Sequence, residues 1–213
     1  NTKQILIGEQ HQIKGVSQEI LSFIKNVQAQ NPRRQIIYLT EFLLQDIDPL
    51  YTLSIMQLYI KDQPYYDIFF WLSTHNICMM GLEPQYVWEM KPPHLYLGHL
   101  FQPKPFPVPL WESVSGVYLR NQSWRGAIAA ARKKYPDALF IIHAGYGHTD
   151  YTSPFSIAGM FNPQETFVLR VVQEEESLFH TFSEGKLAGF SLLGWKDKQL
   201  ALLAGCDAQI KVP

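Results

Sequence analysis

Short, uninterrupted apolar runs alternate along the chain with longer segments in which apolar residues recur every three or four positions. A short run that has no polar residue at alternate positions is typical of a strand buried on both faces of a parallel sheet. The pattern predicts five such strands, at residues 5–9, 35–41, 77–83, 138–143 and 166–172.

The segments between these runs carry apolar stripes at helical spacing. A helix is expected after the first strand, ending near Asn31-Pro32, and another is expected over residues 111–135, closed by Pro136. The basic last turn of the second helix suits the negative end of the helix dipole. The two stripes consist of Val16, Ile20, Ile24 and Val27, and of Trp124, Ile128, Ala131 and Tyr135.

Residues 48–76 are rich in aromatic side chains and predict two helices broken near Gln63-Pro64. Asp48 is expected to cap the first of them, with Pro49 at its first helical position. Further on, Ser153-Pro154 is expected to start a short helix near Ile157.

Strands that alternate with helices over the first two-thirds of the chain predict right-handed crossovers in a mostly parallel sheet. We therefore expect an α/β protein: a three-layer α/β/α sandwich with a mostly parallel central sheet and a small antiparallel β addition at the C-terminus. At 213 residues the chain is expected to form a single domain, residues 1–213. The short C-terminal β segments are residues 178–182, 190–193, 200–203 and 209–212, with turns at Glu184-Gly185 and Lys196-Asp197.

Residues 91–109 interrupt this pattern with six prolines interleaved with aromatic residues. Alternating prolines fit neither a helix nor a central strand. Loops of this length inside a compact domain are usually functional lids or disordered segments. The aromatic content favours a packed, lid-like excursion.

Composition excludes several classes of protein. A hydrophobic fraction of 46% with 17% charged residues describes an ordered globular chain. A net charge of −1, with no basic run longer than Arg132-Lys133-Lys134, argues against nucleic-acid binding. No apolar run predicts a transmembrane segment. The compartment stays open, because a start at Asn1 fits an exported chain whose signal has been removed and because Cys78 and Cys206 could be free or paired.

Charged side chains follow the ends of the predicted strands. If the strands are parallel, Glu9, His11, Glu41, Glu83 and His148 meet at one edge of the sheet, where α/β proteins bind ligands. Two carboxylates about 5 Å apart repel by roughly 3 kcal/mol at an effective dielectric near 20. A cluster of three therefore needs a bound cation, a nearby arginine or one acid kept protonated, and each of these is a functional arrangement. The alternative is that each Glu is a solvated loop residue or a helix-capping partner. Glu83 is the weakest candidate of the three, because Pro84 follows it and could direct it outwards.

Further candidates flank this cluster. Arg120 and Arg125 are the candidate counter-charges, although either could lie on a solvated helix face. His143 is either a binding residue or a core histidine. His148 is expected to be exposed beyond the glycine-bracketed turn that follows the fourth strand. Tyr146 and Asp150 flank His148 and could orient it, but turn composition alone explains both. The remaining histidines, His75, His94, His99 and His180, are expected to be structural or on the surface.

Several short motifs together resemble the erythromycin esterase/ChaN/TIKI-like superfamily. They are Gly8-Glu9-Gln10-His11 after the first strand, Glu41 ending the second, Arg120-Asn121 opening a helix, and Ala144-Gly145-Tyr146-Gly147-His148 after a later strand. The Gly-Glu-x-His spacing is more similar to the ChaN and TIKI branches. The resemblance spans residues 5–172 and implies an α/β/α sandwich with its site at the carboxyl edge of the sheet. It implies three different activities: lactone hydrolysis with a histidine base, metal-dependent proteolysis, or haem binding linked to iron uptake.

Two hypotheses follow. The first is a hydrolase in which His11 or His148 is the general base and Arg120 stabilises an oxyanion. Glu9 and Glu41 would orient the histidines, or a divalent metal would bind Glu9, His11, Glu41 and His148. A Ser or Cys nucleophile is disfavoured, because no Gly-x-Ser-x-Gly elbow is present and Cys78 lies in an apolar run. The second is a ChaN-like haem- or iron-binding protein without catalysis. An inactive descendant that binds a partner stays open; the substrate, small molecule or peptide, and the oligomeric state are unknown.

Overall fold

The structure is a computed structural model. It describes residues 2–11, 15–49, 51, 65–84, 114–153, 155–173, 184–187, 190–194 and 205–212. These residues form an eight-stranded sheet of order β3-β2-β4-β1-β5-β8-β7-β6. The strands are β1 (Gln4–Glu9), β2 (Ile36–Leu44), β3 (Cys78–Glu83), β4 (Leu139–Gly145), β5 (Thr166–Gln173), β6 (Glu184–Leu187), β7 (Phe190–Gly194) and β8 (Ala208–Val212).

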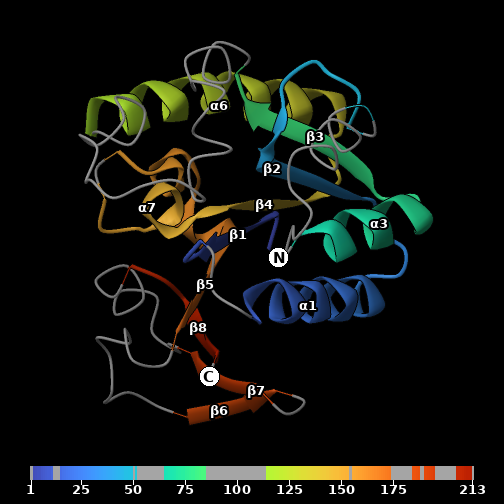
Figure 1. Ribbon diagram of the computed structural model, residues 1–213, viewed down its shortest axis with the longest axis vertical. Helices are drawn as coiled ribbons and strands as arrows, with labels where there is room; N and C mark the ends of the chain where they lie inside the picture. Colours follow the sequence, from blue (N-terminus) through green and yellow to red (C-terminus); the bar gives the residue numbers. More distant parts are fainter. Residues whose placement is uncertain are drawn as a thin grey trace, which may run out of the picture.

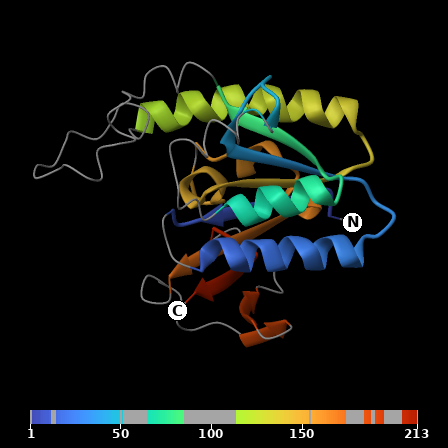
Figure 2. The same ribbon diagram turned by 45° about the vertical axis from the view of Figure 1, so that its right-hand side comes forward.

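Helices cover both faces of this sheet (Figure 1). Figure 2 shows α6 (Val114–Lys134) along one face, and α1 (Val16–Gln30) with α3 (Tyr66–Thr74) along the other. The short helix α7 (Tyr146–Thr149) and the 3-10 turns η3 (Ile157–Met160) and η4 (Pro163–Glu165) follow β4 along the chain. The expected three-layer α/β/α sandwich is confirmed.

Two apolar cores hold the three layers together. On one face, Ile20 and Ile24 of α1 and Phe69 of α3 pack against the inward residues of the sheet. On the other face, Trp124 and Ile128 of α6 pack against the opposite residues of the same strands. Because β1 and β4 are buried on both faces, their sequences are continuous apolar runs rather than alternating ones.

Strand direction is the feature that positions the site. The six consecutive strands β3, β2, β4, β1, β5 and β8 all run in the same direction. In register, Glu9 of β1 lies beside Gly145 of β4, and Thr40 of β2 lies beside His143. The carboxyl ends of β1, β2, β3 and β4 therefore meet at one edge, as the sequence predicts.

The strands differ from the prediction at three places. First, β2 continues to Leu44 instead of ending at Glu41. Its pairing with β4 stops at Thr40 and its pairing with β3 is irregular between Thr40 and Leu44, so Glu41 still lies at the edge. Second, β8 is parallel to β5, and the antiparallel addition consists of β6 and β7. Third, Glu184-Gly185 begins strand β6 and is not a turn.

The helices expected after the first strand and over residues 111–135 are present as α1 and α6. The short helix expected to start at Ser153-Pro154 is instead the 3-10 turn η3, which Ser156 caps. The side-chain oxygen Oδ1 of Asp48 accepts a hydrogen bond from the backbone N–H of Tyr51, as an N-cap does. The two cysteines are both free and belong to the α6-side core. No described helix is long and apolar enough to cross a bilayer. The helix break near Gln63-Pro64, the excursion at residues 91–109, the β segments at 178–182 and 200–203, and the turn at Lys196-Asp197 lie outside the described residues.

Candidate active site

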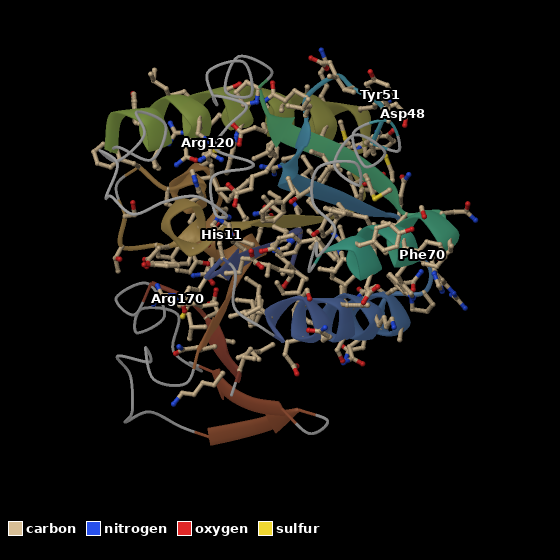
Figure 3. The ribbon with its side chains drawn as sticks, viewed as in Figure 1. His11, Asp48, Tyr51, Phe70, Arg120 and Arg170 are labelled. Atoms are coloured by element: carbon tan, nitrogen blue, oxygen red, sulfur yellow. The ribbon has the colours of Figure 1, made fainter. Side chains whose placement is uncertain are left out.

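A cluster of charged side chains lies at the carboxyl edge of the sheet, beside α7. In Figure 3, His11 and Arg120 lie at this end of the molecule, whereas Asp48, Tyr51 and Phe70 lie at the other. The carboxylates come from three neighbouring strands: Glu9 from β1, Glu41 from β2 and Glu83 from β3. All three are buried, so each requires a partner.

His11 lies between two of these carboxylates. Its Nδ1 is 2.9 Å from Oε1 of Glu9, and its Nε2 is 3.2 Å from Oε1 of Glu41. A carboxylate oxygen can only accept a hydrogen bond, so both ring nitrogens of His11 carry a proton. The geometry therefore makes His11 an imidazolium, although its side chain is 46% exposed to solvent.

Arg120 joins the other pair of carboxylates. Its Nη2 donates to Oε2 of Glu41 at 2.8 Å and also to Oε2 of Glu83, and its Nε donates to Oε1 of Glu83 at 3.0 Å. The guanidinium fork is suited to this two-sided contact, which a point charge could not reproduce. Its remaining nitrogen, Nη1, lies 3.5 Å from Nε2 of His148 and is the least engaged of the three.

His148 is held by α6. Its Nδ1 lies 2.6 Å from Oδ1 of Asn121, and the amide nitrogen of Asn121 in turn donates to the carbonyl of Phe155 at 2.6 Å. The side-chain amide of Asn121 therefore points its nitrogen at an acceptor and its oxygen at the ring of His148. Nδ1 of His148 donates to Asn121, whereas Nε2 faces the donor Nη1 of Arg120. This is the neutral tautomer, with a lone pair on Nε2.

Glu41 contacts both histidines from opposite sides of its carboxylate. Oε1 faces His11 and accepts the backbone N–H of Gly145 at 2.5 Å. Oε2 faces Arg120 and lies 3.8 Å from Nε2 of His148. One buried carboxylate thus lies between a charged histidine and a neutral one.

The surroundings shift the pKa values of the two histidines in opposite directions. Burial opposes the charge on His11, but the hydrogen bonds to Glu41 and Glu9 outweigh it and raise the pKa of His11 to about 10. Burial lowers the pKa of His148 to about 4; the charge of Glu41 opposes the decrease, and the charge of Arg120 adds to it. At neutral pH the first ring is charged and the second is not.

Glu41 and Glu9 stay ionised. Burial alone would raise the pKa of Glu41, but hydrogen bonding to His11 and the charges of His11, His148 and Arg120 hold it well below its usual range. The pKa of Glu9 is lowered in the same way, against burial, by His143, His11 and Tyr65. From the sequence, a bound cation, an arginine or a protonated acid was expected to offset the repulsion between the carboxylates. In the structure, Arg120 and the protonated ring of His11 offset it.

Gly8 explains how α7 reaches the site. A Cβ on Gly8 would overlap Oγ1 of Thr149 and would lie 3.0 Å from Cα of Tyr146. The absence of a side chain lets α7 pack directly on β1, and this close packing places His148 over the sheet edge. The hydroxyl of Ser156 then donates to the carbonyl of His148 at 2.9 Å and fixes the end of the turn.

The structure brings most of the predicted site residues together, in one case against expectation. Glu9, His11, Glu41, Glu83, Arg120, His143 and His148 form one contact network. His148, expected to be exposed beyond its turn, is buried, because α7 folds back on Gly8.

The other predicted residues lie apart from this network. Asp150 pairs with Arg170, and the guanidinium of Arg170 lies over the exposed ring of Tyr146, so neither Asp150 nor Tyr146 orients His148. No described contact joins Arg125 to the three carboxylates. His75 lies at the surface on Trp71, whereas His94, His99 and His180 lie outside the described residues.

Sequence reasoning missed three polar neighbours. Asn121 was recognised only as part of a motif that opens a helix; in the structure it lies inside α6, within hydrogen-bonding distance of His148. The hydroxyl of Tyr65 donates to Oε1 of Glu9, and the hydroxyl of Tyr38 lies 2.5 Å from Nδ1 of His143. A signal existed for Asn121, which continues the buried stripe of Trp124 one turn earlier.

The cluster does not fit a divalent metal or haem in this arrangement. Among the described residues, no group of three or more His, Cys, Asp or Glu side chains is arranged to hold a metal ion. The oxygens that would bind a metal are occupied by the guanidinium of Arg120 and the imidazolium of His11. Both nitrogens of His11 face carboxylates, so this half-exposed ring has no lone pair for haem iron.

No protein-family model and no curated protein match the chain. Among solved structures, the chain is similar to the structure of the type III effector HopBA1, with a TM-score of 0.46. The two sequences are 10% identical, and the match covers 98% of this chain and 87% of that chain. A likeness of this size carries no argument about the fold or the function.

Proposed function

We propose that the cluster is the active site of a hydrolase in which His148 is the general base and His11 the general acid. The observation that carries this proposal is the position of Glu41, whose two oxygens face a doubly protonated histidine and a neutral one. Two like groups whose surroundings separate their protonation states are a common signature of acid–base catalysis. The resemblance in the motifs supports the same class of activity.

The proposed reaction is the addition of water to a carbonyl group. Nε2 of His148 takes a proton from water while the water oxygen attacks the carbonyl carbon. Nη1 of Arg120, the least engaged nitrogen of the guanidinium, stabilises the negative charge that develops on the carbonyl oxygen. The bond to the leaving group then breaks, and His11 gives that group a proton. Transfer of a proton from His148 to His11 restores the starting state, and Glu41 lies between the two rings.

A substrate must carry an acyl carbon that water can attack, so esters, lactones and peptides are the classes to test. No covalent enzyme intermediate is proposed, since the hydroxyl groups that contact Glu9 and His143 are the phenols of Tyr65 and Tyr38, whose burial raises their pKa. The described contacts do not support the haem-binding alternative, because both ring nitrogens of His11 face carboxylates.

The test is hydrolysis of a panel of esters, lactones and peptides by the wild-type protein and by His148→Gln and His11→Gln. Removing either group is expected to lower kcat/KM by at least about 100-fold. The matched control is His75→Gln. His75 is an exposed histidine at the C-cap of α3, and its replacement should leave the activity unchanged. Hydrolysis that survives loss of both His148 and His11 would rule the mechanism out, and a protein inactive on the whole panel would count against the function.

A further inference from the structure

We infer that Tyr38 and His143 form an inner pair of positioning residues that orients Glu9 and, through Glu9, the ring of His11. The inference rests on the proposed function only for the role it gives His11. Its own support is a chain of polar contacts behind the site, which the acid–base step does not use. The chain runs from Tyr38 to His143, Glu9, His11 and Glu41.

The first two members are fully buried between neighbouring strands. Tyr38 on β2 and His143 on β4 both have no exposed surface. Aromatic rings surround the imidazole edge-on, with centroids 5.2 Å away for Phe42 and 5.7 Å away for Tyr65. A histidine packed in this way has little freedom to rotate, so its hydrogen bonds are set by the groups placed around it.

The protonated phenol of Tyr38 sets which atom donates and which accepts along this chain of contacts. Burial and the charge of Glu9 raise the pKa of the phenol, which therefore keeps its proton. The hydroxyl lies 2.5 Å from Nδ1 of His143, and we assign the phenol as the donor in this contact. A histidine nitrogen that accepts a hydrogen bond carries no proton, so the proton of the neutral ring is on Nε2. That nitrogen faces Oε2 of Glu9 at 3.1 Å.

The two carboxylate oxygens of Glu9 have different neighbours, and only Oε2 faces His143. Oε1 accepts from Tyr65 and from Nδ1 of His11. Oε2 is buried and has no well-aligned hydrogen-bond partner in the described part of the chain; its polar neighbour is Nε2 of His143. In the opposite tautomer a lone pair would face a buried carboxylate, an arrangement that costs free energy. The phenol thus sets the tautomer that holds Glu9 in place for His11.

The test is nitrogen NMR of the full chain with labelled histidines at pH 7. In the wild-type protein, His143 should be protonated at Nε2 and unprotonated at Nδ1, and both nitrogens of His11 should be protonated. Tyr38→Phe removes the donor to Nδ1 and leaves that nitrogen buried without its partner, so the Nδ1 signal of His143 should shift and the His11 signals should move with it. The matched control is Phe69→Leu. The ring of Phe69 packs on Tyr38, with centroids 6.4 Å apart, and offers no hydrogen bond, so this change should leave both rings as they are.

Two further variants separate positioning from packing. His143→Leu removes the N–H that faces Glu9, whereas His143→Gln keeps an amide N–H that can reach it. The His11 signals should change in the first and return towards the wild-type pattern in the second. For any substrate that the protein hydrolyses, kcat should fall by about tenfold or more in His143→Leu and recover in His143→Gln.

Three results would overturn the inference: a proton on Nδ1 of His143 in the wild-type protein, unchanged His11 signals in both Tyr38→Phe and His143→Leu, or an equal change in His143→Gln and His143→Leu. If Tyr38→Phe does not fold, the wild-type tautomer and the two His143 variants still decide. Because the spectra need no substrate, an inactive protein would end the proposed function without ending this inference.

Discussion

The ring of His11 occupies the space where a side chain on Gly145 would begin. A Cβ built on Gly145 lies 2.8 Å from Nε2 of His11 and 3.5 Å from Oε1 of Glu41. The backbone of Gly145 has φ −56° and ψ 145°, angles that alanine also adopts. Glycine is therefore needed at position 145 to leave room for the ring of His11, and not to allow an unusual backbone conformation.

Gly145→Ala is expected to displace the His11 ring from Glu41 without removing any charged group. Activity on any substrate should fall, by up to about 100-fold, because a small displacement in an active site is costly. Gly147→Ala is the matched control, since a Cβ at Gly147 meets no atom within 4 Å. Full activity in Gly145→Ala would show that the position of His11 does not matter for the reaction.

Arg120 should be essential for stability as well as for chemistry. Arg120→Leu leaves Glu41 and Glu83 buried without their shared cation, and loss of one partner from a buried ion pair typically costs about 3–5 kcal/mol. The free energy of unfolding in urea measures this loss. Arg125→Leu, five residues further along the same helix, should cost less than about 1 kcal/mol. Equal losses in the two variants would contradict the bridging role.

The stability of the protein should decrease as the pH falls from about 6.5 towards 4. In the folded chain burial lowers the pKa of His148 from 6.5 to about 4, so only the unfolded chain binds a proton there in this interval. The loss is roughly 3 kcal/mol, since each pKa unit corresponds to about 1.4 kcal/mol. Urea unfolding at several pH values measures it.

His148→Gln should flatten this part of the curve. Glu9 and Glu41, whose folded pKa values are lowered, add their own loss only below their usual value of 4.5, so the two effects occupy different pH ranges. A slope between pH 6.5 and 4.5 that persists in His148→Gln would assign it to another group.

On the alkaline side His11 should reverse the trend. Its folded pKa is raised to about 10 from 6.5, so the folded chain holds a proton that the unfolded chain releases. The stabilisation is fully present below pH 6.5 and is lost as the pH rises to 10. His11→Gln should remove this decrease. An unchanged alkaline limb in that variant would show that Glu9 and Glu41 do not hold a charged ring.

The sequence predicted the layers and the sheet edge because both depend on local patterns. A short apolar run such as residues 138–143 is typical of a doubly buried strand, and helices between such strands favour parallel pairing. Parallel pairing in turn brings Glu9 and Glu41 together. Those inferences needed no knowledge of distant contacts.

What the sequence did not predict depends on contacts between distant residues. His148 was expected to be exposed because glycine, threonine and aspartate surround it, and only the packing of α7 on Gly8 buries it. Tyr65 precedes α3 with no motif around it, yet its hydroxyl reaches Glu9. Pro84 suggested that Glu83 points outwards, whereas Arg120 holds it inside.

The central claim is that Glu41 separates a charged histidine from a neutral one, and nitrogen NMR of the labelled wild-type protein at pH 7 tests it most directly. The expected spectrum has both ring nitrogens of His11 protonated, and His148 protonated at Nδ1 alone. His11→Gln and His148→Gln assign the signals. A neutral His11, or a His148 that carries protons on both nitrogens at this pH, would contradict the claim.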